Sequence, residues 1–418
     1  MPKKITILTG AGFTVLPHFA GINTQNLTDG IRGINIPNCM IAGKTPGEYF
    51  YRKLCFHYTG KTKNDCDLST VNFETIIHLL EELYTHLVSF ISGRKNIIPD
   101  YKGVKPAFLK LHQSISTDLE STKIAMGKRF KYEIIIDIYR HFIDFIINQF
   151  KVYNLSKTNK GMNDFYKLFL RKYLKNASWY KRIYTLNYDS WLNSFKNYYD
   201  GFDSNGDFES AKVMNDSDFN CHYNLHGCVL WQNEIQKNNI KKKKHAVNFK
   251  SYVQSSAYGI NREPLLATPI ITGYHKLERM KYNPYLQFYF SFQRDLLDSD
   301  LLLIIGYSFT DTHVNNLLAL YEGKTIVVNY LKVWDDAEKS VKNNLKPTQV
   351  FSYNNVTYDL NDADVQKLYN LLEPSNGGFD PKERDIPKGW VESKNGKTRL
   401  WWRGIGNEFY NNWNALIV

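Results

Sequence analysis

The stretch ITILTGAG, residues 5–12, decides the fold class. Its first five residues are apolar or β-branched, and they lead directly into Gly10 and Gly12. A continuous apolar run is typical of a parallel strand that is buried on both faces. Because a glycine turn after such a strand is typical of the first unit of a doubly wound α/β domain, we expect residues 5–9 to form a central strand.

Further segments along the chain repeat this pattern of a short apolar strand followed by polar residues or glycine. They are RIYTL (182–186), CHYNL (221–225), DLLLII (300–305) and KTIVVN (324–329). A helix expected over residues 311–321 would complete a βαβ unit between the last two strands. Residues 348–353 are expected to add an edge strand. The sequence therefore predicts an α/β fold with a Rossmann-like, doubly wound parallel sheet.

Between the first and second strands the periodicity becomes helical. Apolar residues recur every three or four positions in FETIIHLLEELYTHLVSF (73–90), and similar patterns cover residues 105–116, 130–153 and 163–173. We expect a large helical insertion over residues 72–179 and a small second lobe over 228–300. These belong to a catalytic domain of residues 1–330. Residues 331–418 then hold the edge strand and an aromatic tail. This tail either contacts an oligomer or partner, or packs on the chain's own domain. That tail contains Trp401, Trp402, Phe409, Tyr410 and Trp413.

Composition excludes several classes of protein. Of the 418 residues, 43% are hydrophobic and 22% are charged, which argues against disorder and allows a large core. No apolar run approaches the roughly 20 residues of a membrane span, and residues 5–8 are too short for a signal-peptide core. We therefore expect a cytoplasmic protein that makes no membrane contact.

The cysteines and the net charge suggest no metal site and leave the choice of partner open. Five cysteines form no CxxC pair, so we expect reduced thiols and no zinc site. The net charge of +12 is diffuse apart from the lysine run 241–244. Such a run is typical of a solvated loop, and the alternative is a contact with nucleic acid or an acidic partner.

Unusual residues follow the predicted strands directly. Because the carboxyl ends of parallel strands share one rim, where ligands bind, we expect these clusters to converge on one site. The clusters are Gly10-Ala11-Gly12, Asn187-Tyr188-Asp189, His226-Gly227 and Gly306-Tyr307-Ser308, with Asn329 at the end of the last strand.

Each cluster suits a task at such a site. The turn at Gly10 would let the backbone approach a pyrophosphate, and Ser308 and Asn329 could bond ribose or phosphate hydroxyls, although simple turns and a strand cap explain these residues as well. His226 is the best general base, because an imidazole titrates near neutrality. Asn187 could orient water or ribose without a charge. Asp189 could bond the ligand, or cap a helix that begins at Ser190.

In this order the motifs resemble those of the sirtuin superfamily, and more closely its bacterial branch of antiphage NAD hydrolases. The resemblance covers about residues 1–330. GAGFT (10–14) is similar to the GAG-x-S loop, with Thr14 in place of serine. The others are NFE (72–74), TLNYD (185–189), LHG (225–227), GYSFTDTH (306–313) and VVN (327–329).

The resemblance implies hydrolysis of NAD+ to nicotinamide and ADP-ribose, with Asn187 and His226 as catalytic residues and no metal. It also implies antiphage defence by NAD+ depletion, a homo-oligomer, and in some systems a HerA-type ATPase partner; any contact with nucleic acid would be indirect. The residues expected to bind NAD+ are Gly10, Ala11, Gly12, Phe13, Thr14, Asp189, Gly306, Tyr307, Ser308 and Asn329.

The chain departs from the deacetylase sirtuins in two respects. Only Cys228 lies between His226 and residue 305, so the two CxxC pairs of those enzymes are absent, and the G-I-P-D-F-R segment is missing. Three alternatives therefore remain beside the hydrolase: an NAD-dependent protein deacylase, a sensor that binds NAD+ or ADP-ribose without chemistry, and a nucleic-acid-binding protein that uses the lysine run.

Overall fold

The computed structural model describes the greater part of the 418-residue chain. The described residues are 4–15, 24–37, 39–59, 71–91, 106–121, 131–155, 169–171, 179–195, 197–216, 218–234, 239–243, 269–272, 280–281, 283–309, 311–329, 389–392 and 396–417.

A seven-stranded sheet forms the centre of the molecule, in the order β3-β2-β1-β6-β7-β9-β8. Six strands are parallel, and β8 pairs antiparallel with β9 at the edge. Numbered along the chain, the parallel strands run 3-2-1-4-5-6, which is the Rossmann order, so the predicted fold class is confirmed. The strands are β1 (Lys4–Thr9), β2 (Tyr180–Thr185), β3 (Cys221–Asn224), β6 (Leu301–Ile305), β7 (Lys324–Val328), β8 (Trp390–Glu392) and β9 (Thr398–Trp401).

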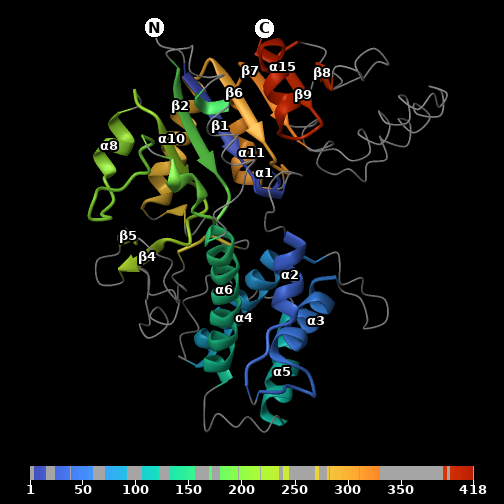
Figure 1. Cartoon of the computed structure of the whole chain (residues 1–418). Helices are drawn as coiled ribbons and strands as arrows, with labels where there is room; N and C mark the ends of the chain where they lie inside the picture. The colour runs from blue at the N-terminus through green and yellow to red at the C-terminus, as the bar shows by residue number, and fades with distance from the viewer. Residues whose placement is uncertain are drawn as a thin grey trace, which may run out of the picture.

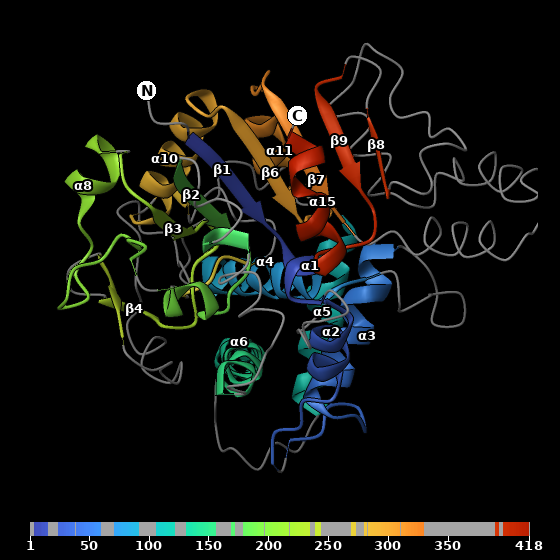
Figure 2. The same ribbon diagram turned by 45° about the horizontal axis from the view of Figure 1, so that its top comes forward.

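Helices cover both faces of this sheet (Figures 1 and 2). On one face, α10 (Tyr285–Leu297) and α11 (Thr312–Leu318) pack against alternate strand residues such as Leu302 and Ile304. On the other, α15 (Asn407–Ile417) packs against the intervening ones, such as Leu301 and Leu303. Because both sets of side chains are buried, the central strand β6 is apolar throughout, as its sequence indicates.

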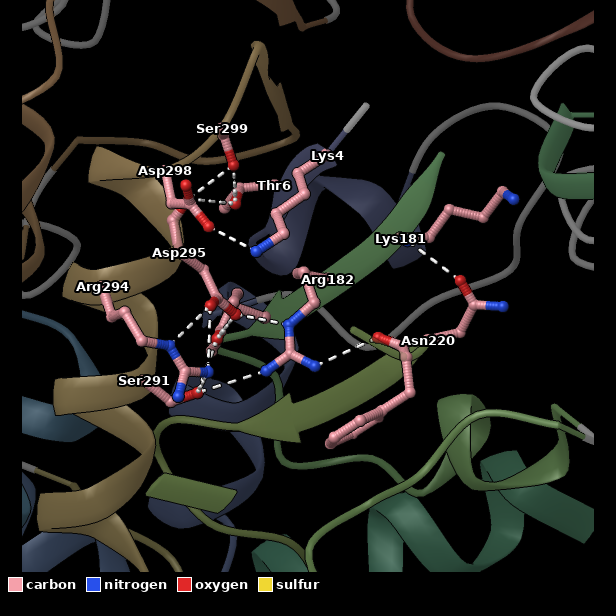
Figure 3. Close-up of polar contacts among 12 residues, drawn as sticks. Lys4, Thr6, Lys181, Arg182, Asn220, Ser291, Arg294, Asp295, Asp298 and Ser299 are labelled. Carbon is pink, nitrogen blue, oxygen red and sulfur yellow. Dashed lines mark hydrogen bonds and ion pairs between the residues drawn. The ribbon is translucent and has the colours of Figure 1, made fainter. Parts of the chain in front are cut away.

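A buried ion pair fastens α10 to the sheet (Figure 3). Arg182 of β2 donates from Nε to Asp295 of α10 at 2.5 Å, and both side chains are fully buried. The Tyr184 hydroxyl donates to the same carboxylate oxygen at 2.5 Å, and Arg294 donates to the other oxygen at 3.0 Å. The pair is thus surrounded by hydrogen bonds, which a buried ion pair requires.

A helical lobe lies beyond the carboxyl ends of the strands (Figure 1). Its helices share one hydrophobic core, in which Leu27 and Leu54 pack in the same cluster as Leu80 and Phe142. Two of them precede residue 72, so the helical cluster begins earlier than the predicted insertion; of the helix expected over 163–173, only residues 169–171 are described. The helices are α2 (Thr24–Arg32), α3 (Pro46–Thr59), α4 (Phe73–Ile91), α5 (Pro106–Ser121) and α6 (Lys131–Leu155).

The lysine run does not form the loop expected from the sequence. β4 (Trp231–Glu234) and β5 (Asn239–Lys242) form an antiparallel hairpin, which places Lys241 and Lys242 in a strand. Lys241 Nζ lies 3.1 Å from an Asp207 carboxylate oxygen, and Lys242 pairs with Asp200. The charges of these two lysines are therefore partly neutralised within the chain. Lys244 lies outside the described residues.

The aromatic tail is part of the core, which is the second of the two alternatives that the sequence left open. All five aromatic residues are at most 2% exposed, because β9 extends the sheet beside β7 and α15 covers one face. The edge strand expected over residues 348–353 lies outside the described residues, and the strands at this edge come from β8 and β9. The five buried residues are Trp401, Trp402, Phe409, Tyr410 and Trp413.

None of the described helices is long and apolar enough to span a bilayer. The four described cysteines are buried free thiols, and within the described ranges no three His, Cys, Asp or Glu side chains gather as a metal site.

Candidate active site

The site lies where the strand order reverses, between β1 and β6. The amide of Gly10 donates to the carbonyl of Ile305 at 2.9 Å, and the amide of Gly12 donates to the carbonyl of Gly306 at 2.8 Å. The turn after β1, which leads into α1 (Ala11–Val15), therefore touches the turn after β6. Such a switch point is where doubly wound sheets bind ligands.

The glycines allow these two turns to meet. A Cβ on Gly10 would lie 2.6 Å from the Gly306 carbonyl oxygen, and a Cβ on Gly306 would lie 2.1 Å from the Phe13 nitrogen. Gly306 also has a positive φ of 60°. The sequence interpretation assigned the glycines to a pyrophosphate approach. In the structure they serve contact between the turns, and the Gly10 and Gly12 amides already donate within the protein.

The remaining residues of the first turn are placed differently from one another. The side chain of Ala11 is exposed, whereas the Phe13 ring is buried with its centroid 5.2 Å from that of Trp191. Thr14 lies in α1. Phe13 therefore anchors the turn in the core, whereas the Ala11 side chain is exposed.

Asn187 and Asp189 are held by the end of the neighbouring strand. The Asn187 amide donates to Thr185 Oγ1 at 3.1 Å. The side-chain amide of Asn224, the last residue of β3, lies 3.4 Å from the carbonyl oxygens of both Asn187 and Asp189. Asn187 is 9% exposed. Its position is thus fixed by backbone contacts rather than by its own side chain.

Of the two roles expected of Asp189, the structure shows the helix cap. Its Oδ1 accepts from the Trp191 amide at 3.0 Å, at the start of the 3-10 helix η4 (Trp191–Ser194). Its Oδ2 is buried and makes no hydrogen bond to any described residue. Burial raises the pKa of Asp189 to about 6, while the bond from the Trp191 amide lowers it.

A second buried polar atom lies at the same edge. Thr9 Oγ1, at the end of β1, also makes no hydrogen bond to a described residue. A buried polar atom without a partner costs about 1–3 kcal/mol. Both orphaned oxygens belong to residues that end or follow central strands, and a hydroxyl-bearing ligand at this edge would satisfy them.

The side chain of Tyr188, which lies between Asn187 and Asp189 in the sequence, contacts the helical lobe. Its hydroxyl lies 3.0 Å from a Glu74 carboxylate oxygen and 3.0 Å from the Ile271 carbonyl oxygen. Its ring packs edge-on against Phe150 of α6, with centroids 6.0 Å apart. Glu74 belongs to the NFE segment, whose Asn72 caps α4 by accepting from the Thr75 amide at 3.0 Å. The expected helix start is confirmed.

His226 is buried where β3 ends. Gly227 has a φ of 87°, and a Cβ there would lie 2.2 Å from the Pro269 carbonyl oxygen, so glycine is required after the histidine. The His226 carbonyl accepts from the Ile271 amide at 2.7 Å. His226 is 4% exposed, and the amides of the residues before and after it, Leu225 and Gly227, donate to the Thr185 and Asn224 carbonyls.

The structure adds Asp311, which the sequence interpretation did not single out. His226 Nε2 lies 3.2 Å from Asp311 Oδ2, and both side chains are 5% exposed. The other oxygen, Oδ1, caps α11 by accepting from the amides of His313 and Val314. The available signal was an aspartate at the start of the helix predicted over residues 311–321, inside GYSFTDTH, and it indicates only a cap.

The loop after β6 is held mainly by internal bonds. The Tyr307 ring is buried, and its hydroxyl accepts from the Asp311 amide at 3.2 Å and donates to Asn315 Oδ1 at 2.7 Å. Asn329 donates from Nδ2 to the Tyr307 carbonyl at 3.2 Å. Ser308 is half-buried. Tyr307 and Asn329 therefore shape the loop, and among the residues expected to bind NAD+, Ala11 is exposed while Ser308 and Asn329 are half-buried.

All the predicted clusters therefore lie along one edge of the sheet, although their side chains do not all face outward. A separate cavity of about 590 Å³ lies at the opposite edge, against Tyr180 and Asn220 at the amino ends of β2 and β3. We place the site at the carboxyl edge because the buried imidazole, the carboxylates and the orphaned oxygens gather there.

No protein-family model matches this chain, and no curated protein sequence matches it closely enough to count as a relative.

Proposed function

We propose that this chain is an NAD+ hydrolase that cleaves the bond between nicotinamide and ribose. The observation that carries the proposal is the placement of Asn187 and His226. Both are buried at the carboxyl ends of adjacent parallel strands, and Asn224 ties the two loops together. Neighbouring strand ends supply further donors and acceptors for a dinucleotide, at the switch point where this fold class binds such ligands.

The reaction needs a positioned nucleophile more than a strong one. As the glycosidic bond breaks, its electron pair passes to the cationic ring, which leaves as neutral nicotinamide, and the ribose develops oxocarbenium character. Water then adds to the anomeric carbon of the ribose, and His226 accepts the proton that the water loses. Asn187, which is neutral, would orient the water or a ribose hydroxyl without disturbing the charge.

Asp189 and Thr9 support the same proposal from the ligand side. The Asp189 Oδ2 and Thr9 Oγ1 atoms are buried and make no hydrogen bond to any residue in the described part of the chain, and ribose hydroxyls are groups that could bond to both. We propose that Asp189 binds the nicotinamide ribose. Gly10, Gly12 and Gly306 would then shape the wall for the pyrophosphate through the contact between their turns.

In a cell, such an enzyme would deplete NAD+, and we propose that it acts as an antiphage effector. Unregulated activity would kill the host, so control through a homo-oligomer or a HerA-type ATPase belongs to the proposal. The aromatic tail is not the proposed contact, because its aromatic side chains are buried in the chain's own core. The helical lobe, which contacts the site through Tyr188, is the proposed route by which a partner would act.

The test measures nicotinamide release from NAD+ by chromatography. The whole protein is assayed alone and with a HerA-type ATPase. The variants Asn187→Ala and His226→Ala are compared with His57→Ala, which removes a histidine of α3 outside the site. We expect release by wild type and His57→Ala and a loss of at least about a hundredfold in the site variants. Release that required acylated peptide would identify a deacylase, and tight binding without turnover would identify a sensor.

A further inference from the structure

His226 and Asp311 reach each other from separate parts of the fold. His226 follows β3, and Asp311 lies between β6 and α11. In the sheet, β3 and β6 lie on opposite sides of β1. The 3.2 Å separation between Nε2 and Oδ2 lies inside the protein, where both side chains are 5% exposed. An electrostatic contact screened this little by solvent is stronger than the same contact at a surface.

The two oxygens of Asp311 face different partners. Oδ1 accepts from the His313 amide at 3.0 Å and from the Val314 amide at 3.2 Å. The Asp311 backbone is fixed in turn by the Tyr307 hydroxyl. Since the helix cap holds Oδ1, the carboxylate cannot rotate freely, and Oδ2 stays close to the imidazole, 3.2 Å from Nε2.

We propose that Asp311 is the positioning residue for His226, a role that rests on the proposed function of this site. A carboxylate at Nε2 favours the neutral tautomer with its proton on Nε2, so the lone pair of the neutral ring lies on Nδ1. When Nδ1 takes the proton released by water, the ring becomes a cation beside the carboxylate. Asp311 keeps its own charge and stabilises the imidazolium.

The variant Asp311→Asn separates this role from that of the cap. Asparagine is as good a helix cap as aspartate, so its oxygen can keep the bonds to the His313 and Val314 amides. Its NH2 group then faces His226, which must accept at Nε2 and carry its proton on Nδ1. The substitution therefore reverses the tautomer while leaving the helix start in place.

The experiment combines nuclear magnetic resonance with kinetics on the full chain. Long-range ¹H–¹⁵N correlations of histidine-labelled protein report the tautomer of His226, whose signals are assigned by their absence in His226→Gln. We expect an Nε2 proton in wild type and an Nδ1 proton in Asp311→Asn. The kcat for nicotinamide release should fall on the order of a thousandfold with KM changed by less than about threefold.

Asn315→Ala is the matched control. It removes bonds to the Phe309 carbonyl and the Tyr307 hydroxyl in the same loop but leaves the Asp311 carboxylate intact, so the His226 tautomer should not change. The same tautomer in wild type and Asp311→Asn, or an equal kcat in the two, overturns the proposal. If wild type releases no nicotinamide, the proposed function fails, and the tautomer comparison alone still decides whether Asp311 positions His226.

Discussion

The hydroxyl of Tyr188 lies 3.0 Å from a carboxylate oxygen of Glu74, joining the loop that carries Asn187 to the first turn of α4. Tyr188 stands between the two predicted site residues of that loop, yet its side chain points away from the sheet and into the helical lobe. A displacement of α4 would therefore shift the position of Asn187.

Removing this bond should affect activity more than its energy suggests. In Tyr188→Phe the ring and its packing on Phe150 remain, and the free energy of unfolding should fall by about 1 kcal/mol. Nicotinamide release should fall severalfold, because Asn187 loses an anchor. Tyr139→Phe is the control, since the Tyr139 hydroxyl donates to Glu81 at 2.7 Å wholly inside the lobe. Equal activity in the two variants would show that the link to Glu74 does not act on the site.

The buried ion pair of Arg182 and Asp295 should contribute strongly to stability (Figure 3). Asp295→Ala leaves the Arg182 guanidinium buried without its carboxylate, and we expect a loss of about 3–5 kcal/mol in urea unfolding. Asp298→Ala breaks an ion pair with Lys4 in which the Asp298 side chain is 57% exposed, and should cost less than about 1 kcal/mol. Similar losses in both variants would contradict this account of how α10 is held.

Asp189 should make the protein less stable as the pH rises. Its pKa is about 6 in the folded protein and 3.8 ordinarily, so between pH 4 and pH 6 the folded state binds more protons than the unfolded state. Stability is full below this window and falls through it, by about 3 kcal/mol in total. Asp189→Asn should abolish the fall, as measured by urea unfolding at a series of pH values; an unchanged slope would contradict the burial of a titrating carboxyl.

His222 should act with the opposite sign. Burial lowers the pKa of His222 to about 4, and neither ring nitrogen makes a hydrogen bond to a described residue. Because the ordinary value is 6.5, the unfolded state binds the extra proton between pH 4 and pH 6.5, and stability is lost as the pH falls through that window. His222→Phe should remove this loss. In wild type the two slopes partly cancel, so each variant alone should reveal the slope of the residue that remains.

The contact between the two glycine turns is testable by adding one methyl group. Gly10→Ala places a Cβ 2.6 Å from the Gly306 carbonyl oxygen, so we expect a loss of about 1–3 kcal/mol in stability together with lost activity. Gly33→Ala is the control, because a Cβ there approaches nothing closer than 3.5 Å. If Gly10→Ala were as stable as Gly33→Ala, close contact would not explain the glycine.

The sheet was largely predictable because the pattern of its central strands is local. The strand residues ITILT and LLLII are apolar or β-branched, and this indicates burial on both faces without knowledge of their neighbours. The edge strand β9 was not predictable in the same way. Its sequence, TRLW, is short and half polar, and it becomes a strand through pairing with β7, far away in the chain. The aromatic tail posed the same problem, since tryptophans suit an interface and a core equally well.

The site was predictable only as a set of strand ends. Parallel topology places Asn187 and His226 on one rim, and the motifs mark both residues. Asp311 was missed because its pairing with His226 depends on the relative placement of β3 and α11, which no local pattern encodes. The glycines were expected at the correct turns, but their contact with each other is a property of two loops and cannot be inferred from either alone.

Products and binding measured in the same preparation decide whether this chain cleaves NAD+ with His226. Wild-type protein incubated with NAD+ and no peptide should yield nicotinamide and ADP-ribose in equal amounts. His226→Ala should yield neither above background, while calorimetry shows that it still binds ADP-ribose. Equal product formation by wild type and His226→Ala would contradict the account, as would a wild type that binds NAD+ and never cleaves it.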